Sequence, residues 1–208
     1  METVTTRLVP STYEFSNISY LSITNESNMY TNTDSTTYAT VTSSRASTSS
    51  YYVYLRGFNF NDIPSDAVVS SFTIKLKARE TGVSTSSSYR PRICNGTTTL
   101  DGTFGTIGTT DAVLTCTGIT NNFGTIKGYG SDFGIRINIR RASSSTQQYM
   151  YISGAEIEVT YTIPPRLYYK SEGSWIVIDK GYEKISGNWT EGEILDLFYS
   201  GQAYRKED

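Results

Sequence analysis

The sequence predicts an all-β protein, an antiparallel two-sheet sandwich followed by a small module of β-hairpin repeats. Three observations predict it. The 208 residues are rich in Thr, Tyr, Val, Ile and Phe, with 17 tyrosines, and these residues suit a pleated, half-buried surface. Segments of alternating polar and apolar residues recur along the chain, and no helical period occurs before residue 190. Polar loops separate these segments.

About eight strands of uneven length are expected in residues 1–163. Residues 68–79 give the cleanest alternation, with a core-facing side made by Val68, Ser70, Phe72, Ile74, Leu76 and Ala78 and a water-facing side made by Ser71, Thr73, Lys75, Lys77 and Arg79. The other strands are expected at 51–60, 92–94, 111–120, 133–141 and 149–163, the last with a bulge near Gly154. Residues 1–50 are polar and partly extended, with weaker strands at 13–23 and 37–41.

A jelly roll is favoured over an immunoglobulin fold. Both tryptophans lie beyond residue 163, so the Cys–Trp–Cys signature of an immunoglobulin domain is missing from the sandwich. Pro164 and Pro165 end the last strand and mark the boundary to a module of residues 164–208.

The C-terminal module contains the pattern Y-x-K-x-x-G-x-W twice, from Tyr168 to Trp175 and from Tyr182 to Trp189. Each copy predicts a β-hairpin with glycine at the turn and tryptophan on the return strand. We expect these tyrosines and tryptophans to form the core or an interface of the module, with stacking on a sugar as the alternative. Residues 191–204 predict a short helical segment.

Charge and hydropathy exclude several classes of protein. The net charge is −2, so no basic surplus exists to neutralise nucleic-acid phosphates. No apolar run approaches the roughly 20 residues of a membrane helix, so membrane insertion is not expected. The N-terminus has no apolar signal-peptide core, which indicates synthesis in a cytoplasm. Cys94 and Cys116 are therefore expected to be free, with one disulfide as the alternative.

The sequence shows no catalytic machinery. Histidine is absent, which removes Ser-His-Asp and Cys-His arrangements and most zinc sites, so neither a metal nor a cofactor is expected. Carboxylate pairs could in principle serve glycoside hydrolysis. The candidates are Asp62 with Asp66, Glu156 with Glu158, and the cluster Glu191, Glu193 and Asp196. We interpret the first pair as turn residues and the second as part of a solvated strand face.

Aromatic residues form the candidate ligand-binding surface, because their rings combine apolar area with polar tips. Phe123, Tyr129 and Phe133 lie in and beside a glycine-rich loop, and Tyr52 and Tyr54 lie on the strand at 51–60. The alternative is that these rings pack in the core of the sandwich or in an oligomer interface.

Three segments resemble surface proteins of tailed-bacteriophage virions. Residues 132–161 resemble the last two strands of the jelly-roll domains in such proteins, and 62–80 resemble their first long strand. The Y-x-K-x-x-G-x-W pair resembles the short Trp hairpin repeats that end many phage structural proteins. The resemblance is one of architecture and transfers no functional residue.

The resemblance implies a non-enzymatic component of the virion surface, such as a tail protein, a neck or head fibre, or a capsid decoration protein. It implies other virion proteins as partners, a homo-oligomer with a trimer favoured, and a host cell-surface glycan as a candidate ligand. A free carbohydrate-binding module and a glycan depolymerase are the alternative functions. Within the virion reading, the Trp module is expected to be the anchor or a trimer contact.

Overall fold

The computed structural model describes residues 2–16, 21–43, 51–81, 90–105, 107–126, 129–139, 149–163, 167–171, 174–178, 181–185 and 188–192. Within these residues almost all regular structure is β-strand, and a single short 3-10 helix, η1, covers Glu26–Met29. The chain divides into two compact units, Met1–Ile163 and Pro164–Asp208.

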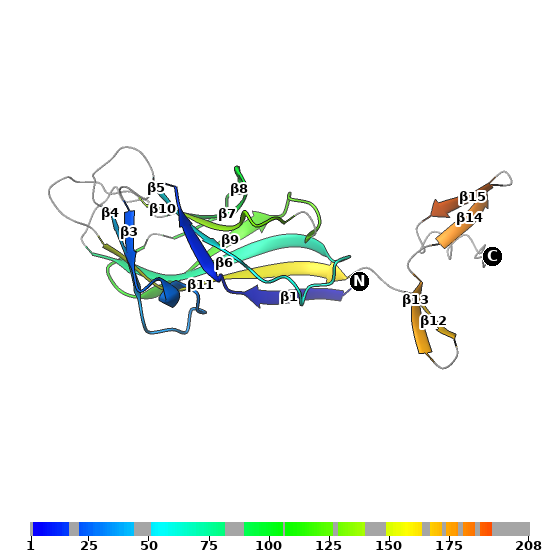
Figure 1. Cartoon of the computed structure of the whole chain (residues 1–208), viewed down its shortest axis with the longest axis horizontal. Coiled ribbons are helices and arrows are strands. Elements are labelled where there is room, and N and C mark those ends of the chain that lie inside the picture. The colour runs from blue at the N-terminus through cyan, green and yellow to red at the C-terminus, as the bar shows by residue number, and fades with distance from the viewer. Residues whose placement is uncertain are drawn as a thin grey trace. The chain divides into compact units, whose positions relative to one another are not determined.

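The first unit contains two antiparallel sheets (Figure 1). Sheet A consists of β1 (Glu2–Leu8), β3 (Leu21–Thr24), β4 (Ala39–Ser43), β6 (Val68–Glu80), β9 (Ala112–Thr120) and β11 (Tyr149–Ile163). Sheet B consists of β2 (Thr12–Phe15), β5 (Tyr51–Arg56), β7 (Pro91–Asn95), β8 (Thr98–Leu100) and β10 (Phe133–Ile139). The predicted all-β sandwich is confirmed.

The strand order is that of a jelly roll. Sheet A runs β3-β4-β11-β6-β9 and sheet B runs β2-β5-β10-β7-β8. The antiparallel pairs follow one another as in one long hairpin that is rolled up into two sheets. From its open end to its turn the pairs are β4–β11, β5–β10, β6–β9 and β7–β8. In this arrangement strands far apart in the sequence become neighbours.

The apolar side of β6 builds much of the core, and one bulge changes its phase. Phe72 and Ile74 point inward as predicted. Before them the alternation fails: Val69 is buried, whereas Val68 is 57% exposed. The register against β11 shifts between Thr160 and Tyr161, so one extra residue of β6 turns the strand over. The predicted inward positions of Val68 and Ser70 are therefore wrong, because both residues are exposed.

The long strand β11 carries two partners along one edge. β4 pairs with its first residues and β1 with its last, from Ile157 to Ile163. Between them the amide of Ala155 donates to the carbonyl of Thr31 at 3.1 Å. Here a Cβ on Gly154 would lie 2.1 Å from the carbonyl oxygen of Asn32. The bulge predicted near Gly154 is confirmed by a register shift between Ile152 and Gly154.

Several strand boundaries differ from the prediction. The strand expected at 13–23 is two strands in different sheets, β2 and β3. β1 and β8 were not predicted, because a polar N-terminus and a three-residue strand after a Gly turn give little periodicity. The buried faces of β5 and β10, by contrast, follow their sequence alternation.

The second unit is described at the level of its backbone. β12 (Leu167–Ser171) pairs with β13 (Ser174–Ile178), and β14 (Gly181–Ile185) pairs with β15 (Asn188–Gly192). Both pairs share one register, with Lys170 opposite Trp175 and Lys184 opposite Trp189. The side-chain roles of Tyr168, Trp175, Tyr182 and Trp189 stay predictions. Of the helical segment expected at 191–204, the first two residues belong to β15 and the rest lies outside the described residues.

Candidate functional site

The rings of the predicted glycine-rich loop lie against the core. Phe133 is 2% exposed, and Tyr129 stacks on it with 4.7 Å between ring centroids. Phe123 contacts both rings edge-on and also meets Phe72. This packing is what the core alternative requires, and a ligand role for Phe123 and Tyr129 stays a prediction. The hydroxyl of Tyr129 is buried; this burial raises the pKa of the tyrosine, and the neighbouring Asn121 side chain opposes the rise.

Tyr52 and Tyr54 lie elsewhere, on the outer face of sheet B. The strict alternation of β5 buries Tyr51 and Val53 and leaves Tyr52 and Tyr54 half-buried on the other side. Their ring centroids are 6.2 Å apart. The structure therefore separates the five predicted ligand-binding residues into a core group and a surface pair.

Arginines cover both surface rings. Arg56 Cζ lies 4.7 Å from the ring centroid of Tyr54, and Arg136 Cζ lies 4.6 Å from that of Tyr52. The pairing of β10 with β5 sets Arg136 directly opposite Tyr54 and Asn138 directly opposite Tyr52. We call this surface the tyrosine–arginine face; its members are Tyr52, Tyr54, Arg56, Arg136 and Asn138. Cation–π contacts of this kind hold a guanidinium in place at modest energetic gain.

The arginines of this side of sheet B differ in their partners. Arg56 Nε lies 3.0 Å from a carboxylate oxygen of Glu14, and Arg92 Nε lies 2.5 Å from one of Asp101. Arg136 forms no ion pair with any described residue. Arg136 Nε and Asn138 Oδ1 are both buried atoms without a hydrogen-bond partner among the described residues. A donor and an acceptor two residues apart on β10 are thus left unsatisfied.

Cys94 lies in the same sheet and is fully buried. Its strand pairs with β10 so that Cys94 is opposite Gly134, and its thiol donates to the Gly134 carbonyl at 3.4 Å. Burial raises the pKa of Cys94 to about 11, and the nearby Arg56 and Arg136 oppose that rise. Cys94 is therefore a protonated thiol at neutral pH. Both cysteines are free, in agreement with the prediction.

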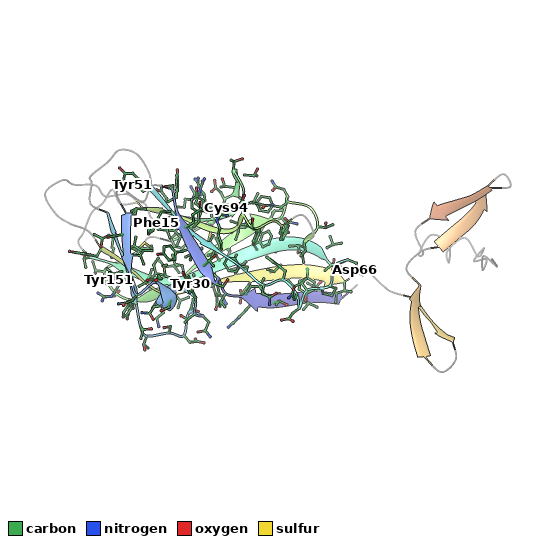
Figure 2. The ribbon with its side chains drawn as sticks, in the orientation of Figure 1. Phe15, Tyr30, Tyr51, Asp66, Cys94 and Tyr151 are labelled. Carbon is green, nitrogen blue, oxygen red and sulfur yellow. The ribbon has the colours of Figure 1, made fainter. Side chains whose placement is uncertain are left out.

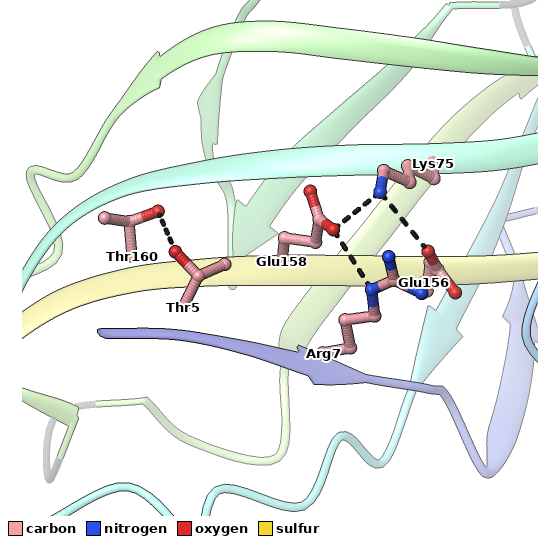
Figure 3. Close-up of polar contacts among 6 residues, drawn as sticks. All are labelled: Thr5, Arg7, Lys75, Glu156, Glu158 and Thr160. Atoms are coloured by element: carbon pink, nitrogen blue, oxygen red, sulfur yellow. Dashed lines mark hydrogen bonds and ion pairs between the residues drawn. The ribbon is translucent and has the colours of Figure 1, made fainter. Parts of the chain in front are cut away.

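The outer face of sheet A carries a cluster of paired charges (Figure 3). Lys75 Nζ lies 2.6 Å from Glu158 Oε1 and 3.9 Å from Glu156 Oε1, and Arg7 Nε lies 3.2 Å from Glu158 Oε1. We call Arg7, Lys75, Glu156 and Glu158 the charge cluster. It joins β1, β6 and β11 across the face.

The interpretation of Glu156 as a solvated residue is wrong, because its side chain is only 1% exposed. The chain that follows η1 lies over this part of the sheet: Thr31 Oγ1 donates to the Ser153 carbonyl at 3.0 Å, and Lys77 Nζ donates to the Ser35 carbonyl at 2.6 Å. Glu158 keeps 19% of its side chain exposed. Strand alternation places both glutamates on the outer face, as predicted, but cannot show that another segment covers it.

Sheet A carries a Tyr–Arg group of its own, which was not predicted. Arg79 Cζ lies 4.2 Å from the ring centroid of Tyr151 and 5.2 Å from that of Tyr38. Arg79 Nε pairs with Asp111 at 3.3 Å, and the Tyr38 hydroxyl donates to the same carboxylate. This arginine has the same kind of aromatic support as Arg136 but also has a counter-charge.

The remaining acidic candidates are the pair Asp62 and Asp66 and the cluster at 191–196. Asp62 and Asp66 are exposed in the turn between β5 and β6, where the Ala67 amide donates to the Pro64 carbonyl. Glu191 belongs to β15, whereas Glu193 and Asp196 lie outside the described residues. In the described ranges no three His, Cys, Asp or Glu side chains come together as a metal site would need.

The two ends of the sandwich differ in what they carry. Glu2 pairs with Ile163, so β1 begins where β11 ends (Figure 1). The other ends of the strands lead into the connections 16–20, 44–50, 81–90 and 140–148, which are rich in Ser and Thr. Tyr51 and Tyr151 lie toward this second end and Asp66 toward the first (Figure 2).

Comparisons with protein-family models, curated proteins and solved structures give no match for this chain. Within the described residues, no helix is long and apolar enough to cross a membrane.

Proposed function

We propose that the chain is a non-enzymatic structural protein of a bacteriophage virion. In this proposal it is a homo-oligomeric tail, fibre or capsid decoration component that is exposed on the particle and contributes to host adsorption. The polarity of the jelly roll carries the proposal. The start of β1 and the end of β11 share one end of the sandwich, and the ends of β2, β4, β6 and β10 that precede four Ser- and Thr-rich stretches of the sequence share the other. A domain with this polarity can be attached at one end and display the other.

The composition of the outer faces supports an assembling protein. Tyr and Arg are enriched at protein interfaces, where they contribute a large share of the binding energy. Both outer faces of the sandwich carry Tyr–Arg groups, around Tyr52 on sheet B and around Tyr151 on sheet A. Such faces suit binding to another macromolecule, either another virion protein or a ligand on the host.

Two measurements on the full chain test the proposal. Light scattering of the purified chain is expected to give the mass of an oligomer, with a trimer as the specific expectation. A gold-labelled antibody against the chain is expected to decorate intact virions from its source. A monomeric chain together with undecorated virions would refute the proposal.

A free carbohydrate-binding module is the second candidate function, and the tyrosine–arginine face favours it. Aromatic rings beside hydrogen-bonding groups are typical of sugar-binding surfaces. A glycan array on the full chain tests this function, with binding expected to weaken in Tyr52→Ala. Binding to no glycan, or binding that survives the substitution unchanged, would count against it.

A further inference from the structure

We propose that the tyrosine–arginine face binds an acidic polysaccharide, with Arg136 contacting the anionic group of one repeating unit. The inference deepens the proposed role in host adsorption and rests on it. The recognised chemistry is a carboxylate or a phosphate that recurs along a hydroxyl-rich polymer.

The first step is the charge of Arg136. In the described part of this side of sheet B, Arg56 and Arg92 each lie within ion-pair distance of a carboxylate, and Arg136 does not. A guanidinium is always charged and presents its donors in a planar fork that matches carboxylate and phosphate oxygens. Arg136 is therefore a cation available for an external anion.

The second step is its positioning. Arg136 is half-buried, and Tyr52 lies beneath its guanidinium at 4.6 Å. A side chain held this way loses less freedom when it binds a ligand than an arginine free in solvent. An anion also gains more from a half-buried cation than from a fully solvated one, because solvent screening is weaker.

The third step is the neighbouring acceptor. Asn138 Oδ1 and Arg136 Nε lack partners within the described residues, and they lie on the same face of β10. Both atoms are shielded from solvent in this structure, so a ligand would reach them only after the two side chains turn outward; an anionic oxygen would then bind Arg136 and a hydroxyl would bind Asn138. Acidic sugars and polyol phosphates carry both groups in one repeating unit.

The acids around the face argue against a nucleic acid as the ligand. Glu14 and Asp132 flank Arg56, and Asp101 pairs with Arg92. These carboxylates and the net charge of −2 disfavour a nucleic acid, because its binding depends on several cations that neutralise successive phosphates. The face offers one cation without a counter-charge among the described residues, and a single acidic sugar unit can place its anionic group there with its hydroxyls beside it.

The test measures binding of the full chain to three polymers by isothermal titration calorimetry at low ionic strength. Polygalacturonate supplies carboxylates, poly(glycerol phosphate) supplies phosphates, and dextran is neutral. We expect binding to one of the acidic polymers and none to dextran. Arg136→Ala should weaken that binding by about tenfold or more, the loss of one charge-assisted contact.

Arg79→Ala is the matched control, because Arg79 also lies over a tyrosine but is paired with Asp111. It should leave polymer affinity unchanged. Equal weakening in Arg79→Ala and Arg136→Ala, or no binding of either acidic polymer, would overturn the inference. So would dissociation of the oligomer by Arg136→Ala, because the face would then be covered by a second copy.

The failure of this inference can be told apart from failure of the proposed function. Antibody decoration of virions does not depend on the ligand of this face. Decorated virions with no polymer binding would reject the ligand and keep the structural role, whereas polymer binding by a chain that is missing from virions would do the reverse.

Discussion

The outer faces of the two sheets use the same kinds of residues to different ends. On sheet A, Lys75 and Arg7 pair with glutamates, and Arg79 pairs with Asp111. On sheet B, Arg136 rests on a tyrosine with no carboxylate partner among the described residues. Part of sheet A is covered by the chain from Thr31 to Ser35, which buries Glu156. Among the described residues of sheet A, Arg7, Lys75 and Arg79 have carboxylate partners and Lys77 donates to a backbone carbonyl, whereas Arg136 on sheet B has neither kind of partner.

This difference predicts that the charges on sheet A affect the stability of the fold more than Arg136 on sheet B does. A buried ion pair adds little to stability against an apolar pair, but removing one partner is costly because the other charge stays buried. Arg136 is half-buried and has no ion-pair partner among the described residues, so its removal leaves no opposite charge without a partner. Substitution of Lys75 in the charge cluster should therefore be costly, whereas substitution of Arg136 on the tyrosine–arginine face should be tolerated.

The largest expected effect is at the charge cluster. Lys75→Met should lower the free energy of unfolding by about 3 kcal/mol, because Glu156 would remain buried without its nearest counter-charge. Urea denaturation at pH 7 measures the loss. Arg7→Ala is the control, since Arg7 is 62% exposed and its pair with Glu158 should contribute less than about 0.5 kcal/mol. Equal losses in the two variants would show that burial of Glu156 does not set the cost.

The cover over sheet A gives the next largest effect. Gly154→Ala should destabilise the chain by about 2 kcal/mol, because the new Cβ would lie 2.1 Å from the Asn32 carbonyl oxygen and displace the covering segment. The same denaturation measurement applies. Gly108→Ala is the matched substitution at a glycine where a Cβ would meet nothing within 4 Å, so it should change stability little. A tolerated Gly154→Ala would mean that the cover on sheet A is loosely held.

Alkaline pH tests the buried side of sheet B through the thiol of Cys94. Burial raises the pKa of Cys94 from 9.0 to about 11. The thiol therefore stays protonated in the folded chain at pH values where it ionises in the unfolded chain. Below pH 9 the thiol therefore costs no stability, and the free energy of unfolding falls as the pH rises from 9 to 11. At pH 10 the loss should be on the order of 1 kcal/mol. The free energy of unfolding of wild type should therefore fall more steeply between pH 8 and 10 than that of Cys94→Ala; parallel curves would contradict the assignment.

Local alternation predicted more of the molecule than long-range pairing could. The inward faces of β5 and β10, the bulge at Gly154 and the free cysteines all followed from the sequence. Val68 was misplaced because a bulge leaves no periodic signal. Glu156 was misplaced because the segment that covers it lies more than 100 residues earlier in the chain. Tyr52 was predicted as a ligand contact and Arg136 was not, because only the pairing of β5 with β10 brings the two side chains together.

The smallest expected effect is the one that best separates the two faces. Arg136→Ala should change the free energy of unfolding by less than about 0.5 kcal/mol, because the lost contact with Tyr52 is offset by removal of a buried Nε that has no partner in the described chain. Arg56→Ala should cost more, about 1 kcal/mol, since Arg56 combines a contact with Tyr54 and a pair with Glu14. Thermal or urea denaturation of both variants gives the comparison. If Arg136→Ala is as costly as Arg56→Ala, Arg136 stabilises the sheet as the arginines on sheet A do. That result would contradict the assignment of Arg136 as a cation that binds a ligand.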